Sequence, residues 1–300
     1  MRWSREAHGL FWGFWGVVGF SLTLPATREA VPWLGATVVG LGRAVLAALV
    51  AAVILVVRRE RFPLEDWFGL TLVVLGVVLG FPWLSAWAME RVPASHGAVV
   101  LALLPLATAG MGAWRAHERP SARFWLASAF GSVAVLAYAI RQGAGQLTMA
   151  DGALLVAVLL AAVGYAEGGR LARRLGGWRV ICWGLVLSLP VTLVPVASAA
   201  AGVHWWAVPP AAWVSLLYVA LGSQLVAFFA WYHGLASGGV ARVSQLQYLQ
   251  VFLTLGWSAI WLRERVTWVS ALAAAMVVIS VAFGRGAQIR QAAAPAPDRP

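Results

Sequence analysis

Runs of about 20 consecutive apolar residues recur along nearly the whole chain, and this feature constrains the fold most. A helix of that length crosses the ~30 Å hydrocarbon core of a bilayer, because it rises about 1.5 Å per residue. The chain is 61% hydrophobic and 11% charged, whereas soluble domains average about 45–50% and about 25%. The runs show none of the short alternating segments of a membrane β-barrel. The sequence therefore predicts an all-α integral membrane protein.

Arginine clusters, prolines and glycines separate the runs and predict ten transmembrane helices. The connections between them are short, so spans adjacent in sequence are expected to be neighbours in space. The first span follows an arginine-bearing start that resembles a signal peptide, but Arg28 and Glu29 near the candidate cleavage site favour a retained helix. The predicted spans are 8–24, 34–57, 66–89, 94–114, 122–140, 150–170, 180–200, 211–232, 240–261 and 267–284.

The net charge of +11 comes from 22 basic residues, all of them arginines scattered through short turns. They form no basic face and accompany no recognition motif, which excludes a nucleic-acid partner. With a cytoplasmic N-terminus, 16 arginines lie inside and 5 outside, and Arg43 lies within a span. The positive-inside rule therefore predicts that both termini lie in the cytoplasm. The single cysteine, Cys182, excludes an internal disulfide, and no metal or cofactor site is predicted.

The chain also resembles itself at an offset of 146 residues, which pairs Pro63 with Pro209 and Trp67 with Trp213. The same offset places the turn "HERPS" over the turn "RERVT". Five spans per half is an odd number, so the halves must cross the membrane in opposite senses. We expect two inverted five-helix repeats with a binding site near the midplane between them. The predicted repeats are residues 1–146 and 147–286, followed by a disordered cytoplasmic tail at 287–300.

Several of these features together resemble one known family. They are a "FWG" in the first span, an arginine (Arg43) after a proline (Pro32) in the second, and the "HERPS" and "RERVT" turns that end the fourth and ninth spans. Over residues 8–284 the chain resembles the EamA branch of the drug/metabolite transporter superfamily, and the YddG-type aromatic amino-acid exporters are the nearest subgroup. The resemblance implies a central cavity surrounded by the first, third, fourth, sixth, eighth and ninth spans. Unlike the family pattern, "HERPS" has no glycine before its glutamate.

The stretch "VSQLQYLQVF" places unusual polarity within the ninth span. At 100° per residue, Ser244, Gln247 and Tyr248 lie on one stripe, whereas Gln245 and Gln250 lie off it. A polar stripe in a membrane helix faces protein or water rather than lipid. It either binds a solute or bonds across a packed helix interface, where each hydrogen bond contributes about 0.6 kcal/mol.

Aromatic residues beside glycines mark further candidates for the cavity wall. Trp12, Trp83 and Trp87 lie within spans, although most tryptophans of membrane proteins belong to the interfacial belt. Tyr165 in the sixth span is a candidate for solute contact. His96 begins the fourth span, where it either hydrogen-bonds a helix end or contacts a carboxylate near a cavity mouth.

The eighth span offers two faces that cannot both line one cavity. Polarity selects Gln224 and Phe228, whereas repeat symmetry with the third span selects Gly222 and His233. We favour Gln224, because an amide without a partner in lipid is costly. Arg43 is expected to have a structural role, with its charge snorkelling or paired.

These features predict a secondary transporter that exports small metabolites, most plausibly amino acids of aromatic or other amphipathic character, by alternating access. Two other classes stay open: a membrane-embedded lipid-group transferase, and a passive channel. Phosphate loops, metal-ligand spacing and a serine with a suitable base are all missing from the sequence, which argues against an enzyme. The acidic residues within the predicted spans are Glu167, expected to pair with Arg170 and Arg174, and Asp151. Facilitated diffusion or exchange is therefore expected rather than proton coupling. The oligomeric state is not encoded in any motif, and a monomer is compatible with the sequence.

Overall fold

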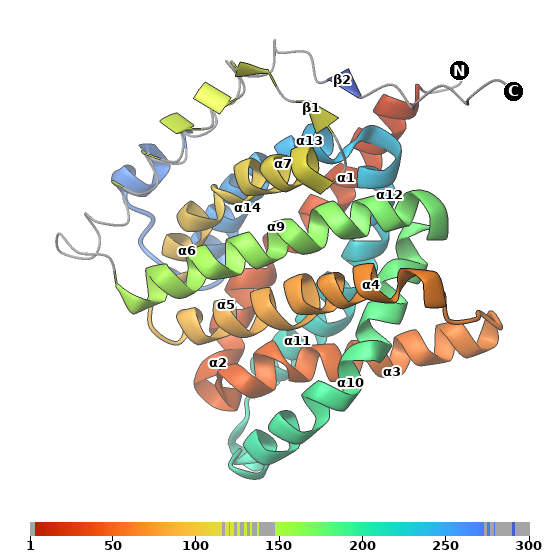
Figure 1. Ribbon diagram of the computed structural model, residues 1–300. Coiled ribbons are helices and arrows are strands. Elements are labelled where there is room, and N and C mark those ends of the chain that lie inside the picture. Colours follow the sequence, from red (N-terminus) through yellow and green to blue (C-terminus); the bar gives the residue numbers. More distant parts are fainter. Residues whose placement is uncertain are drawn as a thin grey trace, which may run out of the picture.

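The computed structural model describes residues 4–115 and 148–272 and shorter pieces at 118–119, 121–122, 125–126, 129–130, 133, 137, 275–276, 279 and 290–291. Within these residues, six helical segments are long and apolar enough to cross a membrane. The six segments are Arg5–Gly40, Leu64–Met89, Ala94–Trp114, Met149–Leu175, Gly177–Ala200 and Pro210–Gly238. They pack into a helical bundle (Figure 1), as expected of an all-helical membrane protein. The spans predicted at 122–140 and 267–284 lie mostly outside the described residues.

The first half of the chain forms seven α-helices, a 3₁₀ turn and a π-helix before the first gap. They are α1 (Arg5–Ser21), α2 (Thr23–Gly40), α3 (Gly42–Val57), η1 (Leu64–Asp66), α4 (Trp67–Val73), η2 (Val74–Gly80), α5 (Phe81–Met89), α6 (Ala94–Leu101) and α7 (Leu104–Arg115). A two-residue strand, β1 (Glu118–Arg119), pairs antiparallel with β2 (Arg290–Gln291), the described piece of the tail.

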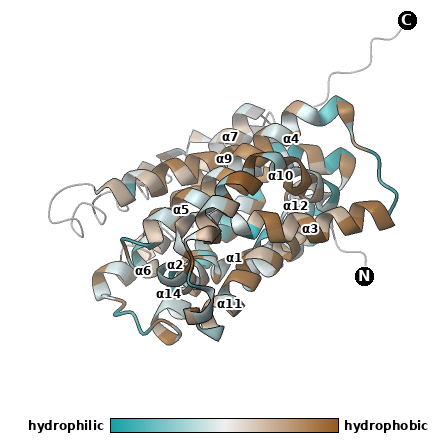
Figure 2. Ribbon diagram, turned by 90° about the horizontal axis from the view of Figure 1, so that it is seen from below, coloured by the Kyte–Doolittle hydropathy of each residue, from teal (hydrophilic) through white to brown (hydrophobic). Residues whose placement is uncertain are grey.

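The second half begins with the two longest uninterrupted helices. Its elements are α9 (Met149–Leu175), α10 (Gly177–Ala201), η3 (Trp205–Ala207), α11 (Pro210–Leu217), η4 (Tyr218–Ala227), α12 (Phe228–Gly238), α13 (Val240–Val243), η5 (Ser244–Leu246) and α14 (Gln247–Ile260). Residues coloured as hydrophilic gather mainly at the connections, while the helices are mostly apolar (Figure 2). This distribution suits helices whose sides face lipid or one another.

The first span is longer than its sequence suggested. Helix continues from α1 through most of α2, past Arg28 and Glu29, and breaks only at Gly35, where φ is +74°. The predicted end at residue 24 is therefore wrong. The Arg28 side chain donates a hydrogen bond to the carbonyl oxygen of Met89, so this charge is held at a helix end rather than starting a turn. A glycine permits the positive φ that reverses the chain at this point.

Two π-helical segments, η2 and η4, lie at related positions in the two halves. Adding 146 to Val74 and Gly80, the ends of η2, gives positions 220 and 226, which both fall within η4. A π-turn widens the helix and moves its hydrogen bonds from residue i+4 to residue i+5. Such segments are common at functional sites, and here each lies in the middle of a span.

The wider turn leaves one carbonyl of η2 without a backbone donor. The N–H of Phe81 bonds to the carbonyl of Gly76, and the next residue, Pro82, has no N–H to offer the carbonyl of Val77. Gln224, in η4, supplies the missing donor: its Nε2 donates a hydrogen bond of 2.9 Å to the carbonyl oxygen of Val77. Gln224 therefore joins the two π-segments, and through them the two halves of the chain.

Glycines allow close helix crossings between the halves. A Cβ at Gly9 would lie 2.4 Å from the Cα of Gly238, and a Cβ at Gly76 would lie 2.9 Å from the Cα of Gly164. The first pair joins α1 to α12. The second pair joins α9 to η2, and these two segments lie side by side in Figure 1. Small residues at such crossings let the backbones approach, as is usual between membrane helices.

Candidate functional site

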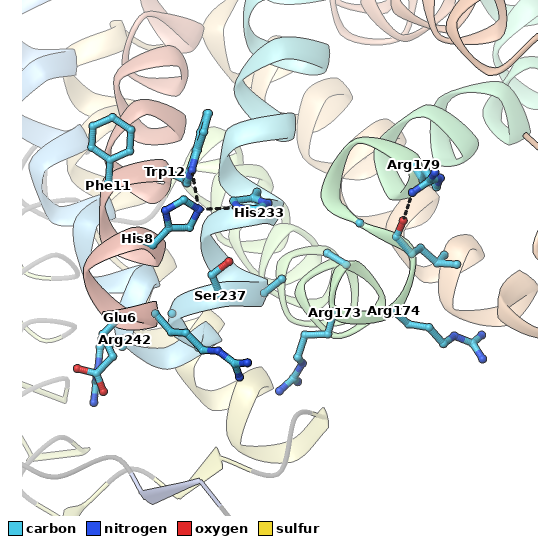
Figure 3. A pocket seen from close by; sticks show the side chains of 17 residues that line it. Glu6, His8, Phe11, Trp12, Arg173, Arg174, Arg179, His233, Ser237 and Arg242 are labelled. Carbon is cyan, nitrogen blue, oxygen red and sulfur yellow. Dashed lines mark hydrogen bonds and ion pairs between the residues drawn. The ribbon is translucent and has the colours of Figure 1, made fainter. Parts of the chain in front are cut away.

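A large hollow opens at the end of the bundle where α1 begins, which we term the arginine-rich end. It has a volume of about 1580 Å³ and lies between the ends of α1, α9, α10, α12 and α13. The arginines that line it are Arg5, Arg173, Arg174, Arg179 and Arg242. Figure 3 shows several of them around the opening. Arg174, Arg179 and Arg242 are each paired with a carboxylate, so part of this positive charge is neutralised.

Trp12 lies in this hollow with two histidines. Its indole Nε1 donates to Nε2 of His8 over 3.1 Å, and Nε2 of His8 lies 3.1 Å from Nε2 of His233 (Figure 3). Sequence reasoning missed His8 and used His233 only as the symmetry alternative to Gln224. The spacing of four residues between His8 and Trp12 could have indicated their contact, since such residues share a helix face.

Trp83 and Trp87 lie elsewhere, in a second hollow at the opposite end of the bundle, which we term the far end. This hollow has a volume of about 690 Å³, and the turn at Gly35 forms part of its wall. The guanidinium of Arg91 stacks 3.6 Å above the ring of Trp87. The structure therefore places Trp12 and the other two tryptophans in separate hollows rather than around one cavity.

A third, much smaller cavity, which we term the central cavity, lies between α6, α7 and α14. Its volume is about 10 Å³, which is at most room for a single water molecule. Gln247 lines it and is 2% exposed, and neither polar atom of its amide has a hydrogen-bond partner among the described residues. A buried amide without partners destabilises the folded protein. Packing alone does not explain this side chain.

The rest of the predicted polar stripe divides into different roles. Ser244 donates to the carbonyl of Ala241 in its own helix, so it is satisfied locally. Tyr248 is buried in a small apolar cluster beside the cavity, with Ala98 among its members. Gln250 was expected off the stripe, and this is wrong, because it lines the same cavity as Gln247 and its Oε1 has no partner among the described residues. Gln247 and Gln250 are three residues apart in α14, so they share a face of that helix.

Thr254 closes the cavity on the side of the first span. Its hydroxyl donates to the carbonyl of Ser21 over 2.7 Å. In an α-helix that carbonyl would bond to the N–H of residue 25, but Pro25 has none. The bond from Thr254 therefore satisfies a backbone group inside the membrane and fixes α14 against α1.

His96 takes the structural role that was left open for it. It is buried, and its Nε2 lies 2.6 Å from Oδ1 of Asp151. Asp151 also belongs to the capping box at the start of α9, with Thr148. Nearby, the carboxylate of Glu264 accepts bonds from the N–H groups of Ala94 and Ser95 at the start of α6. These contacts fasten α6 at the far end.

Tyr165 is buried in an aromatic cluster away from the hollows. Its ring centre lies 6.2 Å from that of Phe20, 5.9 Å from that of Phe228 and 5.4 Å from that of Trp231. Gln224, also predicted as a site residue, bonds instead to the carbonyl of Val77, as described above. Both residues face the protein interior, where they contact neighbouring helices.

Two charged residues were assigned structural roles by the sequence, with different outcomes. Glu167 pairs with Arg170 at 2.7 Å, as predicted, while Arg174 pairs with Glu65 and Asp66 instead. The charge of Arg43 was expected to snorkel or be paired, and this part of the expectation is wrong. Its side chain is 2% exposed, and none of the ion pairs formed within the described residues includes it. The structural role stays a prediction.

Comparison with known proteins identifies relatives of the whole chain. The sequence model of the EamA-like transporter family matches twice, over residues 7–140 and 148–284. A protein of Bacillus subtilis (strain 168), the uncharacterized transporter YdeK, is 42% identical over 283 residues, which cover 94% of this chain and 98% of that protein. A solved crystal structure with 17% identity has the same fold, with a TM-score of 0.66 over 92% of this chain and 95% of that one.

Proposed function

Since this chain belongs to the EamA-like transporter family, we propose that it exports small amphipathic metabolites, amino acids first among them, by alternating access. The family and the transporter YdeK also make it a transport protein rather than an enzyme. The observation that carries the substrate proposal is the buried amide of Gln247 beside the central cavity, which has no partner among the described residues. A solute with a polar head would supply the missing hydrogen bonds.

The side chains around Gln247 suit the rest of such a solute. Tyr248 and the apolar residues Ala98, Leu101 and Val251 are available to pack a hydrophobic side chain. Gln250 offers a second acceptor on the same wall. Such a site is specific for the head group of the solute, because a solute without that group would leave the buried amide without a hydrogen-bond partner.

We further propose that the two matched halves, 1–146 and 147–286, are inverted five-helix repeats within a ten-span bundle. Three observations support this. The family sequence matches once in each half, the π-segments η2 and η4 lie at equivalent positions, and equivalent helix ends form the two hollows at opposite ends of the bundle. When two inverted repeats exchange conformations, a protein that is open at one end of the bundle becomes open at the other end.

The central cavity is closed to a solute in this structure, since about 10 Å³ cannot hold an amino acid. Transport therefore requires α14 to move away from α6 and α7. The contacts that fasten α6 at the far end, His96 with Asp151 and Glu264 with the start of α6, would be released when that end opens. The two hollows are then the vestibules through which the solute enters and leaves.

The arginine distribution supports a bacterial inner-membrane location with both termini cytoplasmic, which makes the arginine-rich end the inner one. Single cysteines at Ser121 and Thr267, in a Cys182→Ala background, should react with an impermeant thiol reagent from opposite sides. The topology and the inverted repeat are wrong if both cysteines react from the same side.

Transport is proposed to run by facilitated diffusion or exchange. The two acidic residues of α9 are Glu167 and Asp151. Glu167 is paired with Arg170 and Asp151 with His96, so neither is free to relay protons. Uphill accumulation in vesicles driven by a pH gradient alone, and lost in Glu167→Gln, would contradict this mechanism.

The direct test of the function is a thermal-shift screen of the purified protein against amino acids, followed by counterflow in proteoliposomes with the solutes that bind. A carrier shows faster uptake when the same solute is present on the far side, and we expect this trans-stimulation. Uptake without trans-stimulation would instead identify a passive channel, and a screen without any binding amino acid would remove the proposed substrate class.

A further inference from the structure

The guanidinium of Arg43 is buried within the membrane-spanning bundle. Arg43 lies seven residues after Ala36, where the second span resumes beyond the turn at Gly35, so it sits roughly 10 Å along that helix. Its Nη2 donates to Oγ of Ser223 over 3.0 Å, and its Nε has no partner among the described residues. A guanidinium has five N–H donors, and this environment leaves it short of acceptors.

Most carboxylates in the described structure are paired with other groups, and none of the ion pairs formed there includes Arg43. The ion pairs formed are Glu6 with Arg242, Glu60 with Arg179, Glu65 and Asp66 with Arg174, Glu90 with Arg91, Asp151 with His96, and Glu167 with Arg170. Around Arg43 the hydrogen-bonding groups are neutral hydroxyls, since Ser223 in turn contacts Oγ1 of Thr23 at 2.7 Å. The positive charge is thus buried without a negative one from the described part of the chain.

A purely structural role accounts poorly for this arrangement. A neutral donor could make the same hydrogen bond to Ser223 and hold the second span against η4 equally well. It would do so without the cost of removing a charge from water. Groups that are unfavourable in the empty protein and lie inside a membrane are characteristic of binding sites. The charge is therefore better explained by a ligand than by packing.

The contacts of Arg43 lead toward the wall of the central cavity. Its partner Ser223 contacts Thr23 on the first span. The carbonyl of Ser21, two residues before Thr23, accepts the bond from Thr254, which lines the cavity. The cation and the cavity are thus linked through these hydrogen bonds and the short piece of backbone between Ser21 and Thr23.

We propose that Arg43 is the counter-charge for a carboxylate of the transported solute, an inference that rests on the proposed transport function and specifies its substrate class. Among the described residues Arg43 is the one buried arginine, and a single charge suits a monoanion rather than a phosphate, which carries about −1.5 to −2. Gln247 then binds the other polar group of the same solute. Entry of the carboxylate requires the same opening of the bundle as entry into the cavity.

The test uses three probes of one shape: leucine, 4-methylpentanoate, which keeps the carboxylate without the amine, and leucinamide, which lacks the carboxylate. Counterflow in proteoliposomes is measured for the wild type, Arg43→Gln and Arg43→Lys. Arg58→Gln is the matched control, because Arg58 is exposed at the other end of the same span. Thermal unfolding of each protein without solute is measured alongside.

We expect the wild type to prefer leucine over leucinamide by about 10- to 150-fold, the range for a hydrogen bond to a charged group. Arg43→Gln should bring this ratio close to one without lowering the unfolding temperature of the empty protein. Arg43→Lys, which keeps the charge without the planar fork, should retain part of the preference. Arg58→Gln should keep the full preference.

Other results overturn the assignment while leaving transport intact. Wild-type protein that carries leucinamide as fast as leucine has no need of a counter-charge, and this holds even if Arg43→Gln fails to fold. An unchanged ratio in Arg43→Gln, with a lower unfolding temperature, identifies a structural arginine. The absence of flux for all three probes would instead contradict the proposed function, and the assignment with it.

Discussion

Gln224 and Gln247 are both fully buried in the second half of the chain, yet their surroundings differ. Nε2 of Gln224 donates to the carbonyl of Val77, which the helix of Val77 cannot satisfy, while Oε1 of Gln224 has no partner among the described residues. Gln247 faces a small cavity, and neither of its polar atoms has a partner within the described part of the chain. The first amide stabilises the closed bundle, whereas the second is a cost that the closed bundle carries. The comparison teaches that burial of a polar group in a membrane helix does not by itself indicate a binding site.

The largest expected effect is on solute affinity in Gln247→Leu. Loss of the hydrogen bonds to the solute should weaken binding by about 5- to 150-fold, which corresponds to about 1–3 kcal/mol. The unfolding temperature in detergent should stay the same or rise, because an unsatisfied buried amide is removed. Counterflow and thermal unfolding measure the two quantities on one preparation.

Gln245→Leu is the matched control for this prediction. Its amide Nε2 lies 3.4 Å from the carbonyl of Ala241 in its own helix, away from the cavity residues. It should change transport far less than Gln247→Leu. Equal losses from the two variants would remove the distinction between a solute-binding glutamine and its neighbours.

Gln224→Leu should show the opposite pattern. The carbonyl of Val77 would lose its donor, and an unsatisfied buried carbonyl costs about 1–3 kcal/mol of stability. The unfolding temperature should fall, while the affinity of the protein that remains folded should be unchanged. A loss of affinity at unchanged stability would place Gln224 in the binding site and collapse the comparison.

Gln250→Leu should have an intermediate effect. Gln250 lines the same cavity as Gln247, and its Oε1 is buried without a partner among the described residues. We expect an affinity loss of about fivefold, the lower end of the range for a hydrogen bond. Counterflow at several solute concentrations would separate this change from a change in maximal rate, and an effect larger than that of Gln247→Leu would reverse the assignment of the main contact.

The smallest effect is expected at Glu60, where a polar contact lies near solvent. Glu60 pairs with Arg179 at 2.7 Å, and this hydrogen bond holds the pKa of Glu60 below its ordinary value of 4.5. The pair therefore stabilises the protein above the ordinary carboxyl pKa, and the stabilisation is lost as the pH falls through the lowered value. Glu60→Gln should cost only about 0.2–1 kcal/mol at neutral pH.

Thermal unfolding of Glu60→Gln and wild type between pH 3 and 7 measures this difference. The two curves should converge at the acidic end. If Glu60→Gln lowers the free energy of unfolding at neutral pH as much as Gln224→Leu does, then a solvent-exposed polar contact stabilises the protein as much as a buried one, and the comparison fails.

The sequence predicted the helices well where its signals were strong. The spans at 66–89, 94–114 and 150–170 agree with the described helices within a few residues at most ends, because turns with arginine, glycine or proline bound them. The first span was predicted to end at residue 24, before the charged residues Arg28 and Glu29, whereas helix continues past them. The reason is a tertiary contact, the bond from Arg28 to the Met89 carbonyl, which no local pattern reveals.

Site residues were harder to assign than spans. The helical wheel selected Gln247 correctly as a buried residue but excluded Gln250, although the two are three residues apart in α14 and line one cavity. It selected Gln224 on polarity, yet the partner of Gln224 arises from a π-turn that meets Pro82 in another helix. Periodicity tells which residues face inward, and only the packed structure tells which of their polar atoms have partners.

The most direct test of the central claim is solute protection of a cysteine in the cavity. Ala98 lines the same cavity as Gln247, so Ala98→Cys is placed in a Cys182→Ala background and reconstituted into liposomes. A small membrane-permeant thiol reagent should label it, and the solute identified by the binding screen should slow labelling in proportion to occupancy. Introduction of Gln247→Leu should shift protection to higher solute concentration. If the solute is transported but leaves the labelling rate of Ala98→Cys unchanged at every concentration, the cavity beside Gln247 is not the binding site.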